Sequence, residues 1–221
     1  QIPDAKISVI HHGVNHELYR EYTQDKLQET KTKFDLPKKF LLFVGSIEPR
    51  KNLLALLRAY NLLTNEEKGD LPLILVGFKG WENRETMQEI QKNQEHIRYL
   101  GYITDKELAH IYNLADIFIY PSLYEGFGLP PLEAMACGTP VIVSNVASLP
   151  EVCGSAALYV DPMDIEDIKD KILTLINDEK LREELSKKSK AQAALFSWDK
   201  AAQEHLKVIA SLLETRIHPR L

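Results

Sequence analysis

The chain has 221 residues, 44% hydrophobic and 27% charged, with a formal net charge of −5 at pH 7. This composition is typical of a globular protein, and the acidic balance argues against a general nucleic-acid-binding protein. Cys137 and Cys153 are the only cysteines. They indicate neither a disulfide framework nor a cysteine-based zinc site, and both thiols are expected to be buried in a reducing compartment. No apolar run approaches the roughly 20 residues that a membrane-spanning helix needs.

The start of the chain has features of an internal segment. It begins at Gln1 without a methionine or a signal-like pattern, and an apolar run at 7–10 predicts a short strand. We therefore expect a fragment of a longer protein. A polar segment over 16–34, rich in Glu, Gln and Lys, favours an exposed helix that ends before Pro37.

Short apolar runs alternate with helical patterns along the rest of the chain. Strands are predicted at 40–45, 73–77, 97–101, 117–120, 141–143 and 157–160, and helices at 53–63, 83–95, 104–114, 130–137, 164–176, 179–196 and 198–215. Thr104 followed by Glu107 is typical of a capping box at a helix start. Strands that alternate with helices in this way predict an α/β fold with a parallel sheet.

The segment 116–144 is the most informative stretch, because it reads as strand, loop, helix and strand. Its loop, residues 121–128 and called the glycine loop below, holds Glu125, Gly126 and Gly128, and Glu133 follows in the predicted first turn of the helix. Parallel α/β sheets bind ligands at the carboxyl edge, so we expect the two carboxylates at successive depths of one pocket there. Backbone N–H groups at Gly126 to Leu129 could take a phosphate or sugar oxygen. A first-turn glutamate also stabilises a helix dipole without any ligand, which explains Glu133 but not Glu125.

A basic pair follows the strand at 40–45. Arg50 and Lys51 lie where the next helix is predicted to begin, and cations there oppose the helix dipole. Because broken local rules tend to mark functional positions, an anion such as a diphosphate is expected to be held by these side chains. The alternative is that both side chains extend into water, and the segment alone does not decide between the two interpretations.

Other candidate positions carry weaker signals. Gly45, Gly77 and Gly101 end three predicted strands at one sheet edge, which suits close approach of a nucleotide, and Tyr102 and Ile103 could frame its base through backbone groups. His12 and His16 have a spacing seen in metal sites, but no carboxylate cluster joins them, so a metal site is disfavoured.

Together these residues resemble the carboxyl-terminal, donor-binding domain of GT-B glycosyltransferases of retaining family 4, the group 1 transferases. The most specific part is the E-x7-E motif, E-G-F-G-L-P-P-L-E at 125–133, between A-D-I-F-I-Y-P-S and M-A-C-G-T-P-V-I. The resemblance covers nearly the whole chain and implies a Rossmann-like parallel sheet with helices on both faces. It divides the chain into an inter-domain strand or linker remnant (1–15), a nucleotide-sugar donor-binding domain (16–196), and a helix that crosses back towards a missing N-terminal domain (197–221).

The resemblance also implies roles for individual residues. Glu125 faces the transferred sugar, and Arg50 and Lys51 stabilise the departing diphosphate. Donor contacts fall to Gly45, Ser46, Gly77, Tyr102, Ile103, Gly126, Phe127, Gly128, Leu129 and Glu133, with Glu133 on the ribose hydroxyls. Many relatives have an arginine where this chain has Ser46. Arg50 is then expected to carry more of the phosphate interaction.

The implied activity is transfer of a sugar from a nucleotide-diphosphate donor, such as GDP-mannose or a UDP-sugar, with retention of configuration and without a metal. The E-P-R-K-N version at 48–52 resembles mannosyl- and rhamnosyltransferases of surface-polysaccharide assembly. The acceptor, a glycan or a lipid-linked glycan, would be bound by the missing N-terminal domain. We therefore expect this chain alone to be inactive and to expose apolar surface near both termini. The full-length parent protein is expected to be cytoplasmic. Peripheral association of the parent with the inner face of the membrane is an open alternative.

Three alternatives remain. One is a non-catalytic nucleotide-sugar-binding module, which an upstream Rossmann-like domain in the full-length protein would exclude. Another is a GT-B relative of different chemistry, such as a nucleotide-sugar 2-epimerase or a sugar phosphorylase, although no motif for a pyridoxal phosphate lysine is found. The third, a dehydrogenase domain, is disfavoured because the loops after Gly45 and Gly77 lack G-x-G-x-x-G. A glycosidase would need both carboxylates to flank one glycosidic bond.

Overall fold

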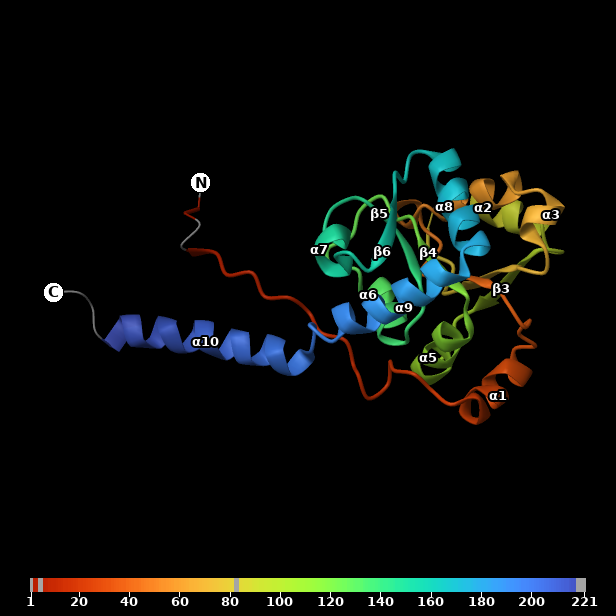
Figure 1. Ribbon diagram of the computed structural model, residues 1–221. Coiled ribbons are helices and arrows are strands. Elements are labelled where there is room, and N and C mark those ends of the chain that lie inside the picture. The colour runs from red at the N-terminus through yellow and green to blue at the C-terminus, as the bar shows by residue number, and fades with distance from the viewer. Residues whose placement is uncertain (1, 4–5, 82–83, 218–221) are drawn as a thin grey trace.

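The computed structural model describes residues 2–3, 6–81 and 84–217, the last four of these by their backbone only. Six parallel strands form one sheet in the order β3-β2-β1-β4-β5-β6 (Figure 1). The strands are β1 (Leu41–Val44), β2 (Leu73–Val76), β3 (Ile97–Gly101), β4 (Ile117–Tyr120), β5 (Val141–Ser144) and β6 (Ala157–Val160). This is the strand order of the doubly wound Rossmann fold, which confirms the predicted class.

The strand sequences explain why the sheet is covered on both faces. Every residue of β1, β2, β4 and β5 is buried, whereas the two edge strands β3 and β6 are only partly buried. Continuous apolar runs without alternation are typical of strands that lie between two layers of helices. The register aligns Leu41 of β1 with Leu73 of β2 on one side and with Ile117 of β4 on the other.

Two layers of helices enclose the sheet (Figure 1). In one layer α2 (Leu53–Leu62) packs against α4 (Arg84–Lys92) and α8 (Ile165–Asn177). In the other layer α6 (Leu129–Ala136) packs against α5 (Asp105–Leu114) and α9 (Glu179–Ala193), and α1 (Gln24–Lys33) lies on α5. The predicted capping box at the start of α5 is present, with Thr104 and Glu107 exchanging both hydrogen bonds.

The strand order reverses between β1 and β4, which lie side by side at the centre of the sheet. After β1 the chain forms a 3₁₀ turn, η2 (Pro49–Lys51), and after β4 it forms the glycine loop. Since parallel strands end at the same edge, the basic pair and the glycine loop meet at this reversal, where open α/β sheets bind ligands.

Three predictions from the sequence are wrong in detail. Residues 7–10 form no strand, because no other described segment pairs with them, and Ile7 and Val9 are 55% and 75% exposed. The helix expected over 16–34 is limited to α1, since Tyr22 donates its backbone N–H to the Asn113 side chain instead. The short helices α3 (Asn65–Lys68) and α7 (Leu149–Cys153) were not predicted, because each is too short for a helical repeat of apolar residues.

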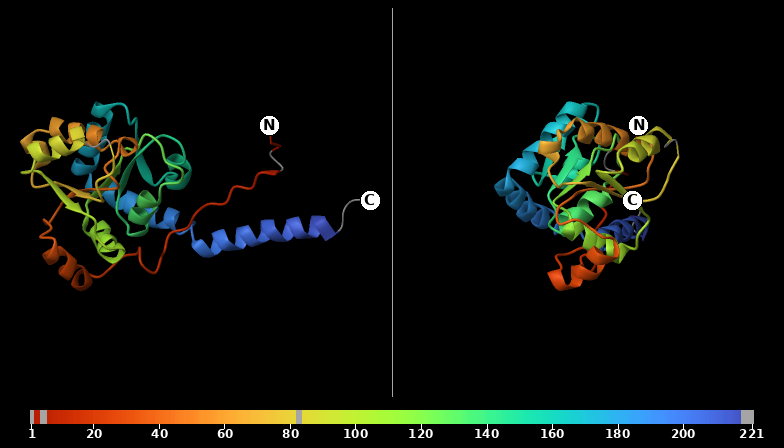
Figure 2. Two further views of the ribbon diagram at one scale, coloured as in Figure 1. Left: turned by 180° about the vertical axis from the view of Figure 1, so that it is seen from behind. Right: turned by 90° about the vertical axis from the view of Figure 1, so that its right-hand side faces the viewer.

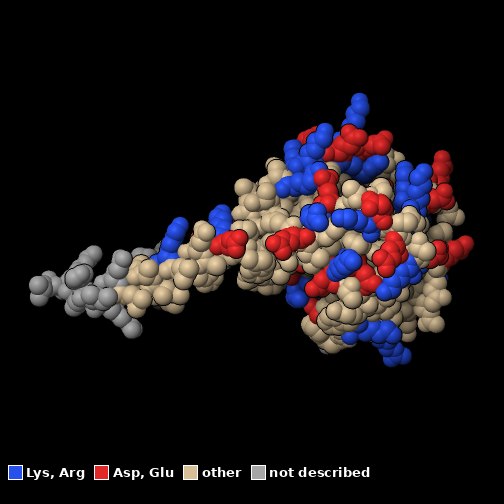
Figure 3. All heavy atoms as spheres, turned by 90° about the horizontal axis from the view of Figure 1, so that it is seen from below, with Lys and Arg blue, Asp and Glu red and all other residues tan. Residues whose placement is uncertain are grey.

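The last helix, α10 (Trp198–Ile217), projects from the domain on the same side as the N-terminal segment (Figures 1 and 2). Its exposed apolar residues include Leu206, Ile209, Leu212 and Leu213. Figure 3 shows acidic and basic side chains interspersed over one face of the domain, while the coloured part of the projecting helix carries few of them. The expected apolar surface near both termini is therefore confirmed. Residues 218–221 of the predicted third segment lie outside the described residues.

Two expectations from composition can be compared with the structure. Cys137 and Cys153 are both buried, as expected for small apolar residues of the core. Within the described ranges, no helix combines the length and apolarity required to cross a membrane.

Candidate functional site

The basic pair is held in place by a left-handed residue. Asn52 has φ of 55° and links η2 to the start of α2. Its side-chain amide donates to the carbonyl oxygen of Pro121 at 3.0 Å and to that of Pro162 at 2.7 Å. The backbone N–H of Leu123 donates to the carbonyl oxygen of Arg50 at 2.9 Å. The segment after β1 is thereby fastened to the segment after β4.

Both cations are paired with carboxylates. Lys51 Nζ donates to Glu125 Oε1 at 2.7 Å and to the Tyr120 hydroxyl at 2.5 Å. Arg50 bridges two acids, with Nη1 2.9 Å from Glu125 Oε2 and Nη2 2.7 Å from Glu48 Oε1. Lys51, Glu48 and Glu125 are buried, and the Arg50 side chain is 39% exposed. The alternative that both cations extend into water is therefore wrong. We call Glu48, Arg50, Lys51 and Glu125 the ion cluster.

Ion pairing favours the charged forms of Glu125 and Arg50. Burial by itself raises the pKa of Glu125, but the hydrogen bond and charge of Lys51 outweigh burial, and the pKa lies below its ordinary value. Burial likewise opposes the charge of Arg50, yet Glu125 and Glu48 raise the pKa of Arg50 overall. Burial, followed by the charge of Glu125, also raises the pKa of Tyr120, so this hydroxyl stays protonated.

The glycine loop presents free backbone donors beside this cluster. The N–H groups of Gly126, Phe127, Gly128 and Leu129 donate to no described residue, and Pro130 and Pro131 have no N–H. Gly128 has φ of +100°, and a Cβ there would lie 2.6 Å from Leu149 Cδ2. A Cβ at Gly126 would meet nothing within 4 Å, so the backbone there is open to an incoming group. Such N–H groups at the start of a helix suit an anion or a sugar oxygen.

Glu133 has surroundings of its own. It is the fifth residue of α6, which begins at Leu129, so it lies just after the first turn in which it was predicted. The Tyr112 hydroxyl donates to Glu133 Oε2 at 3.2 Å. Burial raises the pKa of Glu133 to about 7, although hydrogen bonds from Tyr112 and Tyr19 act in the opposite direction. Among the described residues, Glu133 and Glu125 share no hydrogen-bond partner.

The other predicted donor residues lie along the same edge. Gly77 has φ of +137°, and a Cβ on it would lie 2.0 Å from the carbonyl oxygen of Gly45, so these two strand ends need glycine to approach this closely. Ser46 is half-buried beside them. Tyr102 is 75% exposed, whereas the Ile103 side chain is buried and leaves only its backbone available. The structure brings Arg50, Lys51 and Glu125 into contact, but places Tyr102 and Ile103 after the edge strand β3, away from that cluster.

Sequence reasoning missed three residues of this site. Glu48 and Tyr120 complete the hydrogen bonds of the basic pair, and Ser148 donates to the carbonyl oxygens of Glu125 and Phe127. Glu48 precedes the basic pair by two residues, and Tyr120 ends an apolar strand, so both positions offered a weak signal. Ser148 offered none, because its partners lie 23 and 21 residues earlier.

The histidines near the N-terminus have aromatic and backbone partners. The His12 ring meets the Phe127 ring edge-to-face and the Trp198 ring at a tilt, with centroids 5.1 and 5.5 Å apart. His16 Nε2 lies 3.0 Å from the carbonyl oxygen of Phe196. Among the residues that the structure describes, no group of three or more His, Cys, Asp or Glu is placed to hold a metal ion.

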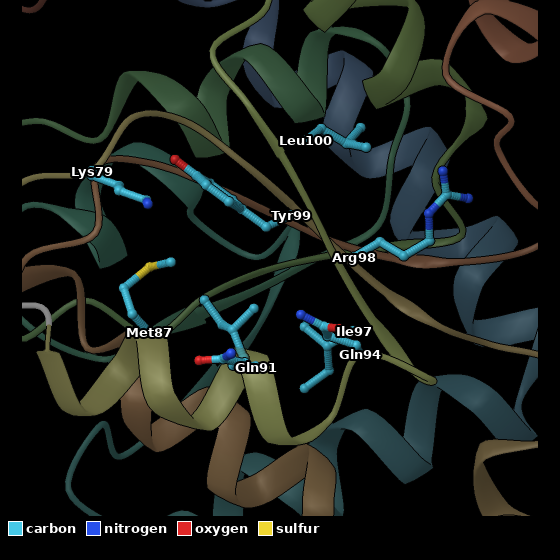
Figure 4. A pocket seen from close by; sticks show the side chains of 9 residues that line it. Lys79, Met87, Gln91, Gln94, Ile97, Arg98, Tyr99 and Leu100 are labelled. Carbon is cyan, nitrogen blue, oxygen red and sulfur yellow. The ribbon is translucent and has the colours of Figure 1, made fainter.

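A large cavity lies elsewhere on the domain. It has a volume of about 700 Å³ and lies between α4 and the edge strand β3, with Lys79 and Tyr99 at one end (Figure 4). It shares no residue with the ion cluster or the glycine loop. Because no convergent charged groups accompany its size, the cavity is a weaker candidate site than the sheet edge.

Comparison with known proteins identifies relatives of this chain. It is 48% identical over 162 residues to the O-antigen chain mannosyltransferase B of Escherichia coli, covering 72% of this chain and 42% of the relative. It is 37% identical over 199 residues to the serotype-specific mannosyltransferase WbdA of Escherichia coli, covering 88% of this chain and 24% of the relative. The chain thus spans less than half the length of these two relatives.

Solved structures share the fold. Sucrose-phosphate synthase from Thermosynechococcus elongatus superposes with a TM-score of 0.79 at 28% identity, over 93% of this chain and 52% of that one. HepE of Anabaena, solved in complex with UDP and glucose, superposes with a TM-score of 0.82 at 20% identity, over 92% and 56%. The expected Rossmann-like parallel sheet of the GT-B fold is therefore confirmed. The model of the family described as glycosyl transferases group 1 matches residues 24–192, and the chain belongs to this family.

Proposed function

We propose that the chain is the donor-binding half of a retaining glycosyltransferase that transfers mannose from a nucleoside-diphosphate donor to a glycan or a lipid-linked acceptor. One observation carries the proposal. Two fixed cations, Arg50 and Lys51, lie against Glu125 beside the backbone N–H groups of Gly126 to Leu129, which donate to no described residue. A negatively charged leaving group and a polar sugar would find complementary groups at this one place.

The chemistry follows from where charge develops. When the bond between the anomeric carbon and the diphosphate oxygen breaks, negative charge grows on the leaving diphosphate. Arg50, Lys51 and the N–H groups from Gly126 onward stabilise that charge, and groups that are already fixed need no reorganisation. A diphosphate competes with Glu125 for the same cations, so donor binding frees the Glu125 carboxylate to face the sugar. No divalent metal is required in this scheme.

The rest of the donor follows the sheet edge. Glu133 accepts hydrogen bonds from the ribose hydroxyls, and the backbone at Tyr102 and Ile103 frames the base. Mannose is favoured as the transferred sugar because both Escherichia coli relatives are described as mannosyltransferases. HepE was solved in complex with UDP and glucose, which supports a nucleotide-sugar donor for this fold. The proposal leaves open whether the base of the donor is guanine or uracil.

The acceptor is proposed to bind a further domain of the parent protein, which the exposed apolar residues near both termini would contact. This chain alone is then a binding domain without transfer activity. The proposal implies that nucleotide binding and transfer can be measured separately, the first on this chain and the second on the parent.

Calorimetric titration tests the proposal. GDP, UDP, GDP-mannose and UDP-glucose are each titrated into the chain, first with EDTA and then with magnesium. Lys51→Met removes one cation of the ion cluster. Lys68→Met is its matched control, because Lys68 is also buried, lying over the Tyr60 ring at 5.0 Å, but is remote from the site.

We expect binding of one nucleotide and its sugar without a metal, about tenfold or more weaker in Lys51→Met and unchanged in Lys68→Met. Equal weakening in both variants would assign the effect to stability rather than to the site. Absence of binding by this chain is followed by the same titration on the parent protein, and absence there too would refute the proposal. Nucleotide binding by a parent that transfers no sugar would favour the non-catalytic module.

A further inference from the structure

We propose that Ser148 is a positioning residue that sets the direction of the N–H groups of Gly126 and Gly128. The inference rests on the proposed function only for the identity of the ligand. The Ser148 hydroxyl lies 2.9 Å from the carbonyl oxygen of Glu125 and 3.0 Å from that of Phe127. One side chain therefore reaches two alternate peptide groups of the glycine loop.

Because of peptide geometry, the contact of Ser148 with these two carbonyl groups also fixes the direction of the N–H groups that follow them. In a trans peptide the C=O of one residue and the N–H of the next point to opposite sides of the chain. No described peptide bond of this chain is cis. A carbonyl of Glu125 that faces Ser148 turns the N–H of Gly126 away from it, and the same holds for Phe127 and Gly128. The two donors therefore point to one common side, away from Ser148.

The hydrogen bonds of Ser148 act on a segment whose backbone is intrinsically flexible. Glycine adopts a wider range of backbone angles than any other residue, so Gly126 and Gly128 could each turn a peptide plane over. Neither N–H has a partner among the described residues that would prevent this. A hydrogen-bonded hydroxyl on the opposite side supplies the missing restraint.

The position of Ser148 in its own helix supports the assignment. Ser148 precedes α7 as its N-cap, where a serine side chain ordinarily accepts a hydrogen bond from the first turn. No such cap hydrogen bond forms, and the hydroxyl is directed to the glycine loop instead. Ser148 therefore lacks the usual N-cap hydrogen bond and contacts the glycine loop instead. A residue that departs from its local structural preference in this way is typical of a functional position.

Helix α7 is itself anchored. Leu149 packs where a Cβ on Gly128 would be, and Glu151 Oε1 lies 2.6 Å from His11 Nε2 on the N-terminal segment. The rings of His11 and His12 contact the Phe127 ring at centroid distances of 6.0 and 5.1 Å. Ser148 is thus fixed relative to the loop that it holds.

The first experiment needs no ligand. Backbone ¹⁵N relaxation is measured on the whole chain as wild type, Ser148→Ala, Ser148→Thr and Ser189→Ala. Ser189 is the matched control, because its hydroxyl also donates to a backbone carbonyl, that of Ala156 at 3.3 Å, but in the interior far from the loop. We expect the order parameters of the Gly126 and Gly128 amides to fall in Ser148→Ala only and to recover in Ser148→Thr. Unchanged order in Ser148→Ala, or an equal fall in Ser189→Ala, would overturn the proposal.

The second experiment uses GDP-mannose and UDP-glucose as probes. For the probe that wild type binds, we expect Ser148→Ala to weaken binding about three- to tenfold, since pre-organisation is lost, and Ser148→Thr to restore it. Ser189→Ala should leave affinity unchanged. Wild type that binds neither probe would count against the proposed function, whereas the relaxation result still decides the role of Ser148. Unaltered affinity in Ser148→Ala, with binding by wild type intact, would refute the positioning role.

Discussion

The ammonium group of Lys51 lies 2.7 Å from the carboxylate of Glu125, and both side chains are buried where the strand order of the sheet reverses. Lys51 follows β1 and Glu125 follows β4, so their ion pair joins the two strands that flank the reversal. Burial of a charge without a partner is costly, and each of these groups therefore depends on the other. A ligand that competes for Lys51 changes the surroundings of Glu125 as well.

The first prediction concerns this dependence. Lys51→Met should lower the free energy of unfolding by about 1–3 kcal/mol, because among the described residues the buried Glu125 keeps only the partly exposed Arg50 as a cationic partner. The double variant Lys51→Met/Glu125→Gln should recover much of that loss. Urea denaturation of the single and double variants measures both effects. A double variant that is less stable than Lys51→Met would contradict the argument.

The second prediction compares two glycines with positive φ. Gly77→Ala should destabilise the protein by about 3 kcal/mol or more, because its Cβ would lie 2.0 Å from the Gly45 carbonyl oxygen. Gly69, at φ of +48° and ψ of −133°, has no atom within 4 Å of such a Cβ, so Gly69→Ala should cost only about 1–2 kcal/mol of backbone strain. Thermal and urea denaturation measure the loss of stability in each variant. The difference between the two losses is the cost of crowding the Gly45 carbonyl oxygen, beyond the backbone strain. Similar losses in both would show that the two strand ends can move apart.

How much of this could be predicted from the sequence depended on how local the signal was. The strands of the sheet are continuous apolar runs, and Thr104 with Glu107 forms a cap within four residues, so both were predicted. The partner of Lys51 lies 74 residues further along the chain and that of the Ser148 hydroxyl 23 residues earlier. Nothing local specifies such pairs. The resemblance assigned roles to Glu125 and Lys51 separately, but only the structure shows that the two side chains are in contact.

The same reasoning explains the errors. Residues 7–10 have the apolar pattern of a strand, but a strand needs a neighbour, and no described segment supplies one. Glu133 was placed in the first turn because Pro130 and Pro131 were read as the helix start, whereas α6 begins at Leu129 and Glu133 is its fifth residue. Helix ends shift easily by one or two residues, and the shift decides whether an acid lies in the first turn.

The third prediction separates the two roles of Asn52. Asn52→Gly keeps access to the left-handed conformation but removes the hydrogen bonds to the Pro121 and Pro162 carbonyls, so we expect a loss of about 1–2 kcal/mol in unfolding free energy. Asn52→Ala removes the same bonds and adds backbone strain at φ of 55°, for a total loss of about 2–4 kcal/mol. Urea denaturation measures both. Equal losses in the two variants would mean that strain contributes nothing at this position.

The fourth prediction is a pH dependence that Glu133 causes. Burial raises its pKa from the ordinary 4.5 to about 7, so between these pH values the native state binds more protons than the unfolded state. Its contribution to stability is therefore present at pH 4.5 and is lost as pH rises through about 7. The difference between the two pKa values corresponds to roughly 3 kcal/mol, and Glu133→Gln, which cannot ionise, should gain about that much over wild type at pH 8 relative to pH 4.5.

Urea denaturation of wild type and Glu133→Gln at several pH values checks this, because the other titrating groups are common to both proteins and cancel in the difference. Tyr112→Phe supplies an independent check at the same carboxylate. The Tyr112 hydroxyl donates to Glu133 and lowers its pKa, so removing it should raise the pKa further and shift the loss of stability to higher pH. A stability difference between wild type and Glu133→Gln that is the same at pH 5 and pH 8 would show that Glu133 is ionised throughout. In that case the carboxylate would already be charged for hydrogen bonds from a ribose, and nucleotide affinity should not rise between pH 6 and pH 8.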